Sequence, residues 1–253
     1  MVKLENVTKR FATTVAVDAL NLEIPAGEVF AFLGPNGAGK TTTIKMMTGL
    51  LRPTEGRITI CGFDIQENPI EAKRCLSYVP DQPFIYDKLT GREFLEFVGR
   101  MYEIPAQERR RRMQSMIERF EISDFADTLC ENYSHGMRQR VVLAAALLHN
   151  PKVLVVDEPM VGLDPRSARI FKNVMREIAG DGAVVFISTH TLAVAEEIAD
   201  RIGIIHHGRL TALGTITEIR ARYRSNAGLE DLFLQLTQDA DGETIVRNSP
   251  DKA

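Results

Sequence analysis

Apolar and polar residues change their spacing several times along the chain, and these changes mark its predicted elements. Short apolar runs typical of strands occupy residues 20–24, 29–33, 57–61, 76–79, 153–156, 183–188 and 201–205. Helical spacing follows at 40–50, 167–179 and 192–199. Near-continuous apolar strands that alternate with helices predict a mostly parallel sheet covered on both faces. We therefore expect an α/β fold.

A second pattern begins near residue 84, where the strand signals stop and helical spacing continues to about 150. Two predicted helix faces carry Phe94, Phe97, Val98 and Met101, and Met113, Met116, Ile117 and Phe120. We expect one domain, 1–253, in which a helical lobe (84–150) is inserted into a core formed by 1–83 and 151–215. An antiparallel β lobe is expected near the N-terminus, where residues 2–33 resemble short strands joined by turns.

The expected C-terminal extension, 216–253, has two parts. Leu229, Leu232, Phe233 and Leu236 have the i, i+3, i+4, i+7 spacing of a short amphipathic helix over 229–237. Residues 238–253 are polar and are expected to form a disordered tail.

Composition narrows the cellular setting. The 253 residues include 31 basic and 34 acidic side chains, so charge gives no reason to expect a nucleic-acid partner. Cys61, Cys75 and Cys130 are isolated in sequence, which favours a reducing cytosol without a disulfide or structural zinc. The N-terminus resembles no secretory signal, and the longest apolar run, 141–148, is shorter than the roughly 20 residues of a membrane span. We expect a soluble protein whose membrane role would come through a partner.

Residues 34–41, GPNGAGKT, form a phosphate-binding loop between an apolar strand and a helix. Glycines at 34, 37 and 39 let successive backbone N–H groups turn toward phosphate oxygens, and the helix dipole adds positive potential. Lys40 supplies a charge for the outer phosphates, and the Thr41 hydroxyl can bind Mg²⁺. The motif predicts binding of a nucleoside triphosphate.

An acidic motif, VLVVDEP at 153–159, places Asp157 117 residues after Lys40. Asp157 ends an apolar strand, so its carboxylate is expected at the sheet edge beside the phosphate loop, around Mg²⁺. Glu158 follows and can activate the attacking water as a general base. A buried strand followed by two exposed acids is the structural alternative.

Together with further motifs in the same order, these two resemble the ATP-binding-cassette (ABC) ATPases over roughly residues 3–215. The family's loop glutamine corresponds to Gln82 in YVPDQ, and its signature corresponds to YSHGM at 133–137. Its aspartate loop corresponds to GLDP at 162–165, and its switch histidine to His190. Phe11 stands 23 residues before the loop, where the family places an aromatic side chain on adenine.

The resemblance implies that ATP and Mg²⁺ bind between two ATPase subunits arranged head to tail. The residues implied around the nucleotide are Phe11, Gly34, Pro35, Asn36, Gly37, Ala38, Gly39, Lys40, Thr41, Thr42, Ser134, Gly136 and Asp164. Those implied around the metal are Thr41, Gln82 and Asp157, and those implied in catalysis are Glu158, His190 and Gln82. Ser134 and Gly136 are expected to reach the γ-phosphate bound by the other subunit. The residues expected to act on ATP bound by their own chain are Lys40, Thr41, Thr42, Gln82, Asp157, Glu158 and His190.

Each residue carried over from the family also has a structural interpretation. The alternatives are an ordinary loop residue for Gln82, a strand end for His190, a helix N-cap for Ser134 or Asn132, a helix cap for Asp164, and a core aromatic for Phe11.

The signature departs from the commonest family pattern, Leu-Ser-Gly-Gly-Gln, at Tyr133, His135 and Met137. The change to His135 would matter if this position required a positive φ. Tyr-Ser-x-Gly-Met resembles a branch of bacterial exporter-type ATPases, and 229–237 resembles the C-terminal helix of that branch.

The resemblance implies a subunit that hydrolyses ATP, energises a membrane transporter and lies in the cytoplasm against the inner face of the cell membrane. Its expected partners are a membrane-spanning permease, docked between the helical lobe and the loop of Gln82, and a second ATPase subunit, identical or paralogous. One alternative is a soluble ABC ATPase acting on a ribosome or DNA complex, although the chain has neither a second cassette nor a long coiled-coil insertion. Another is a regulator that senses ATP without turnover, against which Glu158 argues. Cargo and direction stay open.

Two conspicuous stretches are interpreted as structural. Residues 108–112, ERRRR, are expected to form a solvated helix surface, because consecutive helical residues point all around the axis. Contact with lipid headgroups is the alternative. His206 and His207 are expected on opposite faces of the sheet, in a turn and not a metal site.

Overall fold

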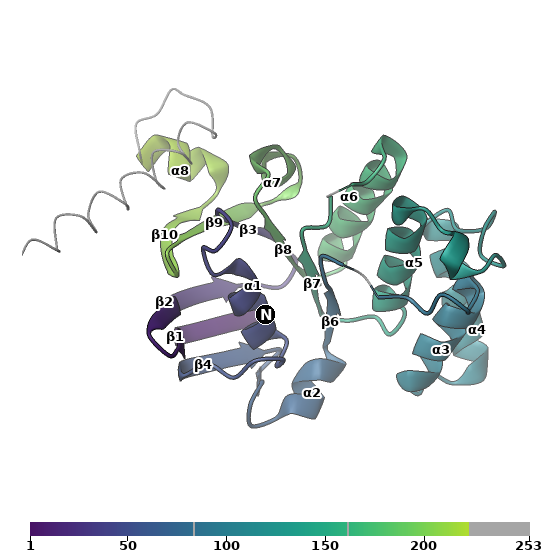
Figure 1. Ribbon diagram of the computed structural model, residues 1–253, viewed down its shortest axis with the longest axis horizontal. Helices are drawn as coiled ribbons and strands as arrows, with labels where there is room; N and C mark the ends of the chain where they lie inside the picture. Colours follow the sequence, from purple (N-terminus) through teal and green to yellow (C-terminus); the bar gives the residue numbers. More distant parts are fainter. Residues whose placement is uncertain (83, 161, 223–253) are drawn as a thin grey trace, which may run out of the picture.

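The computed structural model describes residues 1–82, 84–160 and 162–222, which form two sheets and a set of helices (Figure 1). The first sheet is antiparallel, with the strand order β2-β1-β4-β5. Its strands are β1 (Val2–Phe11), β2 (Thr14–Ile24), β4 (Glu55–Ile60) and β5 (Phe63–Asp64). This sheet is the expected β lobe, and its last two strands come after the phosphate loop in the chain.

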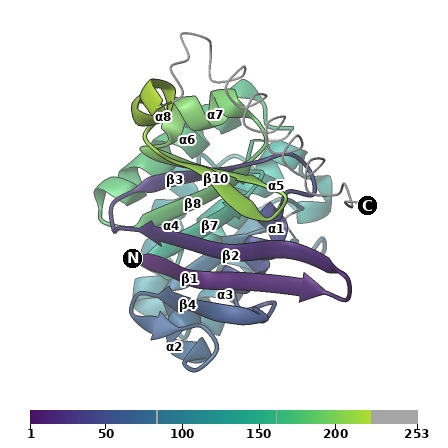
Figure 2. The same ribbon diagram turned by 90° about the vertical axis from the view of Figure 1, so that its left-hand side faces the viewer.

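The second sheet has the order β10-β9-β3-β8-β7-β6 and is parallel except for its edge strand β10. Its strands are β3 (Val29–Leu33), β6 (Leu76–Val79), β7 (Val153–Asp157), β8 (Val184–Thr189), β9 (Arg201–His206) and β10 (Arg209–Gly214). Figure 2 shows the two sheets one above the other. Because parallel strands end at one edge, the residues that follow β3, β6, β7 and β8 come together there.

The α-helices are α1 (Lys40–Met47), α2 (Pro69–Arg74), α3 (Gly91–Met101), α4 (Ala106–Arg119), α5 (His135–Leu147), α6 (Pro165–Gly180), α7 (Leu192–Ile198) and α8 (Ile216–Arg222), with a short 3₁₀ helix at Cys130–Asn132. The short helix α2 was not among the expected elements. The regular elements described between β6 and β7 are helices, and Figure 1 shows α3, α4 and α5 as a group beside the sheet.

Alternate residues of the central strands pack into two different cores, as expected for a sheet covered on both faces. Phe32 and Val155 belong to the core shared with the first sheet and α1. Leu154 and Val156 belong to the core shared with α5 and α6. Helix α1 therefore lies between the two sheets, and the phosphate loop at its start faces the edge where the parallel strands end.

The arginine-rich start of α4 is bound by acidic neighbours. Arg109 donates to Glu96 on α3 with 2.9 Å between Nε and Oε2, and its side chain is only 12% exposed. Arg111 and Arg112 both pair with Glu108 on their own helix, and Arg111 is 77% exposed. The expected solvated surface is therefore present at Arg111, whereas Arg109 ties α4 to α3.

Two local findings differ from what the sequence suggested. The expectation that His206 and His207 lie on opposite faces of the sheet was wrong, because their ring centroids lie 4.0 Å apart. The expected turn is present at residues 207–208, where His207 has a φ of 46° at the end of β9. Cys61 and Cys75, isolated in sequence, lie side by side in space; burial is the main cause that raises the pKa of the Cys61 thiol, and the neighbouring Cys75 adds to it. The predicted helix over 229–237 and the polar tail lie outside the described residues.

Candidate nucleotide site

The phosphate loop joins β3 to α1 through the backbone turns that its glycines predict. Gly37 and Gly39 have φ angles of 82° and 112°, in the left-handed region that favours glycine. A Cβ added to Gly34 would lie 2.4 Å from the backbone oxygen of Ile205 on β9, so a larger residue does not fit there. The loop therefore lies close against β9 and presents its N–H groups at the start of α1.

Lys40, the first residue of α1, is 6% exposed and lies within the loop. Its ammonium donates to the backbone oxygens of Gly34 at 2.7 Å and Pro35 at 3.2 Å, and it lies 3.9 Å from Oε1 of Glu158. Burial lowers the pKa of Lys40, and the carboxylates of Glu158 and Asp157 oppose that shift. The structure thus holds a positive charge where the sequence predicts phosphates.

Asp157 ends β7 and is 4% exposed. The Ser188 hydroxyl, from the neighbouring strand β8, donates to its Oδ1. Burial raises the pKa of the Asp157 carboxyl, and the hydrogen bond from Ser188 opposes this shift. The neighbouring strand of the sheet therefore fixes the orientation of the Asp157 carboxylate.

Glu158 leaves the strand in a left-handed conformation, with a φ of 46°. This conformation costs a residue with a side chain about 1–2 kcal/mol. Its Oε1 lies 2.9 Å from Nδ1 of His190, which follows β8. Its Oε2 is buried and has no hydrogen-bond partner among the described residues. A carboxylate oxygen with free acceptor capacity is suited to act as a general base.

These side chains line one open cavity of about 320 Å³. The lining residues are Ala16, Pro35, Asn36, Gly37, Gly39, Lys40, Thr41, Thr42, Asp81, Asp157 and Glu158. The structure therefore brings the phosphate loop and both acids of the second motif together. Gln82 does not line the cavity, whereas Asp81 of the same loop does, and both residues are exposed. Asp81 was not predicted from the sequence, although its position shortly after β6, at the same sheet edge as Asp157, was a usable signal.

The donor set of the cavity fits Mg²⁺. Over residues 1–82, 84–160 and 162–222, no three His, Cys, Asp or Glu side chains are grouped closely enough to bind a metal ion by themselves. Mg²⁺ sites in nucleotide-binding proteins commonly combine one or two carboxylates with phosphate oxygens and water. The Thr41 hydroxyl and the Asp157 carboxylate would hold the ion, and a bound Mg²⁺ would polarise the outer phosphates.

The signature segment forms the start of α5, away from this cavity. Ser134 is the N-cap, and its hydroxyl accepts an N–H of the first turn at 3.3 Å, so the cap is Ser134 and not Asn132. A Cβ added to Gly136 would lie 2.7 Å from Oδ2 of Asp164, which itself caps α6. Ser134, Gly136 and Asp164 do not line the cavity. Within one chain the signature and the phosphate loop are separate surfaces.

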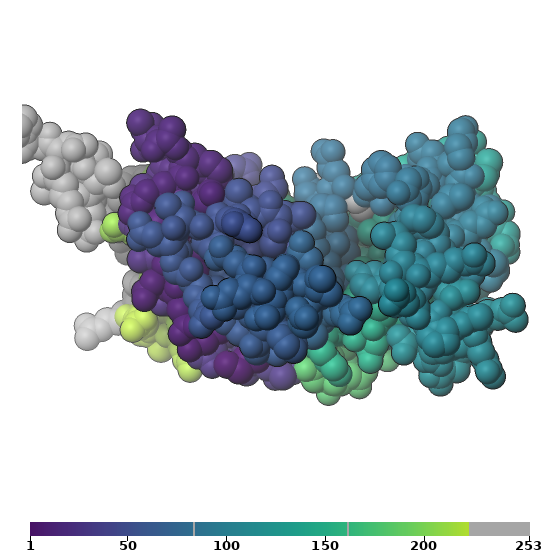
Figure 3. All heavy atoms as spheres, turned by 90° about the horizontal axis from the view of Figure 1, so that it is seen from below, coloured from purple at the N-terminus to yellow at the C-terminus, as the bar shows by residue number. Residues whose placement is uncertain are grey.

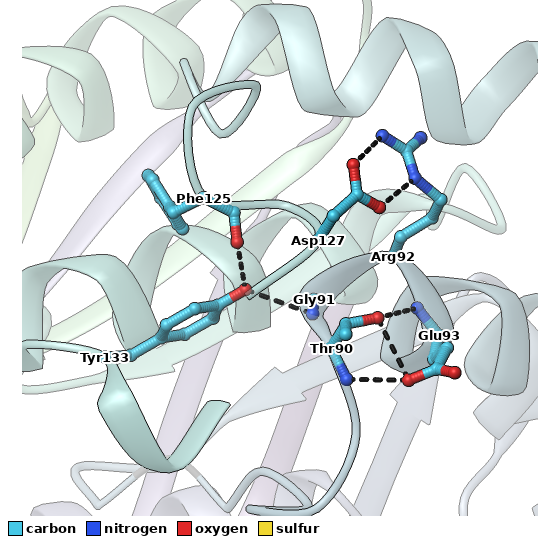
Figure 4. Close-up of polar contacts among 7 residues, drawn as sticks. All are labelled: Thr90, Gly91, Arg92, Glu93, Phe125, Asp127 and Tyr133. Atoms are coloured by element: carbon cyan, nitrogen blue, oxygen red, sulfur yellow. Dashed lines mark hydrogen bonds and ion pairs between the residues drawn. The ribbon is translucent and has the colours of Figure 1, made fainter. Parts of the chain in front are cut away.

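Tyr133, one of the departures from the common signature, anchors this segment to α3 (Figure 4). Its hydroxyl accepts from the N–H of Gly91 at 3.0 Å and donates to the backbone oxygen of Phe125 at 2.7 Å. Its ring packs edge-on against Phe125, with 5.2 Å between centroids. Thr90 and Glu93 form a capping box at the start of the same helix. The tyrosine is therefore explained by the polar groups that its hydroxyl satisfies.

Two further positions named in the sequence analysis, Phe11 and His135, can be placed in the structure. Phe11 ends β1, and its ring is not in the core, because the residue is 47% exposed and Nζ of Lys9 lies 5.1 Å from the ring centroid. His135 is the first residue of α5 and has no positive φ, so its replacement of glycine causes no backbone strain.

Comparisons with known proteins identify a family for this chain. The family model described as ABC transporter matches residues 17–161. The daunorubicin/doxorubicin resistance ATP-binding protein DrrA of Streptomyces peucetius is 38% identical over 225 residues, which cover 89% of this chain and 68% of DrrA. The linearmycin resistance ATP-binding protein LnrL of Bacillus subtilis is 34% identical over 246 residues, which cover 97% and 78%.

Solved structures share the fold. The ATP-binding subunit of an ABC transporter matches with a TM-score of 0.87 and 32% identity over 93% of this chain and 99% of that one. The dimeric cassette MJ0796, in a post-hydrolysis state with ADP and Pi, matches with a TM-score of 0.77 and 28% identity over 85% and 99%. The chain therefore belongs to the ABC transporter family, as one of its ATP-binding, ATP-hydrolysing subunits.

Proposed function

We propose that this chain is the ATPase subunit of an exporter and that it works as a head-to-tail pair with a second ATPase subunit. The observation that carries the proposal is the separation of the two surfaces within one chain. Lys40, Asp157 and Glu158 line the cavity, whereas Ser134 and Gly136 do not. A second subunit is needed to bring a signature segment to the phosphates. Two relatives are named for resistance to daunorubicin/doxorubicin and linearmycin, which supports export.

In the proposed mechanism, each part of the site has one task. Lys40 balances the charge of the outer phosphates, and Asp157 and Thr41 hold Mg²⁺. Oε2 of Glu158 accepts a proton from the attacking water, while His190 orients the carboxylate through Oε1. The start of α5 of the second subunit, capped by Ser134, offers N–H groups to the γ-phosphate. ATP binding closes the pair and hydrolysis reopens it, a two-state change biased by the ligand.

A strip of exposed apolar side chains supports docking of a permease. Phe84 and Met101 are 72% and 68% exposed, values unusual for large apolar residues. Ring centroids of Phe84 and Tyr86 lie 5.2 Å apart, and those of Tyr86 and Phe97 lie 5.4 Å apart. A contiguous apolar surface of this kind is typical of a protein interface. We call Phe84, Tyr86, Phe97 and Met101 the apolar strip.

The apolar strip continues into a hollow of about 650 Å³ between α2 and the end of α3. Its lining is Ile70, Lys73, Arg74, Met101, Tyr102, Glu103 and His149. Figure 3 views the molecule from the side of α2, with the first sheet and the helical lobe on either side. A cytoplasmic segment of a permease that lies there would contact both the helical lobe and the loop after β6. It would place this subunit against the inner face of the cell membrane.

None of the helices described by the structure has the length and apolar character of a membrane span. The proposed membrane-spanning partner can be tested directly. Pull-down from solubilised membranes should recover a polytopic membrane protein, and Phe84→Ser with Met101→Ser should reduce that recovery strongly. Val15→Ser, at an exposed apolar residue of β2, is the control and should not. Recovery of ribosomes or DNA complexes instead would favour the soluble alternative.

The hydrolytic assignment is tested by Glu158→Gln, which keeps the shape of the side chain but removes its basicity. We expect steady-state ATP hydrolysis to fall by at least about 100-fold, because general-base catalysis contributes on this scale. ATP binding should persist, and ATP should shift the variant to a dimer on gel filtration. Unchanged turnover would refute the general-base role, and a variant that binds ATP only as a monomer would refute the paired mechanism.

A further inference from the structure

A second cavity, of about 430 Å³, lies where strands β7 and β8 begin, at the opposite edge of the parallel sheet from the nucleotide cavity. Lys152 directly precedes β7 and Ala183 directly precedes β8, and both residues line it. Asp157, at the other end of the five-residue strand β7, lines the nucleotide cavity. A strand of this length spans roughly 16 Å, so the two cavities are separate. The other walls of the second cavity are α4 and the ends of α5 and α6.

The lining of this cavity is basic, although the chain as a whole has a net charge of −3. Its charged residues are the four cations Arg111, Arg112, Arg119 and Lys152 and the two acids Glu108 and Asp181. Arg119 also pairs with Glu177, which does not line the cavity, with 2.9 Å between Nη2 and Oε2. The cations exceed the acids even when Glu177 is counted. We call this hollow the basic cavity.

Several donors of these cations are free to bind an anion. Glu108 accepts from Nε and Nη2 of Arg111 and from Nε of Arg112, at 2.7 to 2.9 Å. These hydrogen bonds lower the pKa of Glu108 to about 2, so a single carboxylate serves two guanidinium groups. Nη1 of Arg111 and Nη2 of Arg112 donate to no residue that the structure describes. Nζ of Lys152 likewise has no hydrogen-bond or ion-pair partner among the described residues.

Another part of the lining is apolar. Leu147, Leu148, Ile178 and Ala183 line the basic cavity, and each is at most 8% exposed. Cavities of roughly 300–1,000 Å³ that combine an apolar wall with a few polar groups are typical sites for small molecules. An inorganic ion would leave this wall uncovered, whereas an organic anion can cover it and gain from the burial of apolar surface.

We propose that the basic cavity binds an organic molecule through a phosphate monoester. Arg111, Arg112 and Lys152 hold the phosphate, and the apolar part of the ligand packs against the apolar residues of the lining. A phosphate monoester carries a charge of about −1.5 to −2 at pH 7, which matches the excess of cations in the lining. The planar guanidinium groups suit its oxygens. A soluble phosphate ester and phosphatidic acid in a membrane both present this chemistry.

The experiment measures equilibrium dialysis of 1-naphthyl phosphate against the full chain, in saturating Mg·ADP so that the nucleotide cavity is occupied. We expect one saturable site per chain. 1-Naphthol, which lacks the phosphate, and inorganic phosphate, which lacks the ring, should each bind at least about tenfold more weakly, because each makes only one of the two kinds of contact. Wild-type protein without a saturable site for 1-naphthyl phosphate would overturn the proposal.

Two double variants locate the site. Arg111→Gln with Lys152→Gln removes two exposed cations of the basic cavity, and Arg110→Gln with Lys45→Gln removes two exposed cations that do not line it. We expect the first pair to weaken binding of 1-naphthyl phosphate about tenfold, because two charged contacts with the phosphate are lost. The second pair should stay within about twofold of wild type, since distant exposed charges are screened. Equal weakening by the two pairs would contradict a site at this cavity.

Vesicles distinguish the two sources of the phosphate ester. Wild type and the Arg111→Gln, Lys152→Gln variant are sedimented with phosphatidylcholine vesicles that contain or lack phosphatidic acid. A lipid ligand predicts that phosphatidic acid sediments wild type more than the variant and displaces 1-naphthyl phosphate. A soluble ligand predicts equal sedimentation of the two proteins and unchanged binding of 1-naphthyl phosphate. Either result retains the site and identifies the source of its ligand.

Discussion

The two halves of the nucleotide site are built in different ways on the same chain. The phosphate-loop half is a cavity at the ends of parallel strands, where Lys40 and Asp157 are 6% and 4% exposed and the acids act on one another. The signature half is an exposed helix start, where Ser134 caps α5. Two contacts fix its inner side: Tyr133 forms a hydrogen bond with the start of α3, and Gly136 packs against Asp164.

The difference follows from what each half has to do. Charges that bind phosphates gain strength when they are removed from water, but they need partners nearby, so the phosphate-loop half is buried and densely charged. A surface that acts on another subunit has to stay accessible, so its rigidity comes from contacts on its inner side. Changes in the first half should therefore weaken ATP binding by one chain, and changes in the second should reduce turnover.

The largest effect is expected from Lys40→Ala. Removing the Lys40 charge should weaken binding of the fluorescent analogue MANT-ATP at least about 100-fold and abolish turnover, because a buried charge–phosphate contact is lost. Lys45→Ala, at an exposed lysine of the same helix, is the control and should bind normally. If Lys40→Ala binds MANT-ATP within a few-fold of wild type, the phosphate-loop half is not the half that binds ATP.

Gly136→Ala probes the other half. The added Cβ would lie 2.7 Å from Oδ2 of Asp164 and 3.0 Å from Oγ of Ser167, so the start of α5 has to move. We expect turnover to fall roughly 10- to 100-fold, as for a small displacement of a catalytic group, with ATP binding by the single chain unchanged. Gly180→Ala, where a Cβ meets nothing within 4 Å, should be neutral. Loss of binding in Gly136→Ala would mean that the two halves are not independent.

Tyr133→Phe removes only the hydroxyl that anchors the signature. The N–H of Gly91 and the backbone oxygen of Phe125 would lose their partner in a buried setting. The free energy of unfolding should fall by about 1–2 kcal/mol, measured by urea denaturation. Tyr86→Phe, at a 44% exposed tyrosine, should leave stability unchanged. Equal stability of the two variants would show that the anchor is dispensable.

The smallest effect is expected beyond the other end of α5, where His149 stacks on Tyr102 with 3.7 Å between ring centroids. Burial lowers the pKa of His149 from its ordinary value of 6.5 to about 4. As the pH falls, the unfolded chain therefore takes up a proton at His149 at a higher pH than the folded chain does. This protonation favours unfolding, so the contribution of His149 to stability is complete above pH 6.5 and declines toward pH 4.

Between pH 7 and pH 5, wild type should lose about 1 kcal/mol more stability than His149→Phe, after allowance for solvent screening. Chemical denaturation at the two pH values measures the difference. Parallel losses in both proteins would mean that His149 does not set the pH response of this region.

Much of the fold was predictable because its signals are local. The apolar runs at 29–33 and 76–79 coincide with β3 and β6, and a proline-containing segment follows each run. The prediction was incomplete at the N-terminus, where the run at 20–24 is only the second half of β2, which begins at Thr14. The first half of that strand is exposed along much of its length, and its pairing with β1 defines it. Pairing with a distant strand is not visible in a short window of sequence.

The candidate site shows the same division. Lys40, Thr41, Asp157 and Glu158 were identified from motifs, and all four line the cavity. Gln82 was chosen on the family's pattern, yet Asp81 is the residue of that loop in the cavity. A motif gives the chemistry of a loop, but the direction of each side chain depends on the strand that the loop leaves and on the neighbour with which that strand pairs.

The sequence by itself determined that the chain binds and hydrolyses ATP on an α/β core, because glycines, a lysine and strand-end acids express that chemistry within short segments. Only the tertiary structure decided that Asp81 and not Gln82 joins the acids, and that Tyr133 and Asp164 hold the signature apart from the phosphate loop. These outcomes depend on strand order and on packing between residues far apart in the chain. That packing is settled when the two cores form, and no local pattern of residues records it.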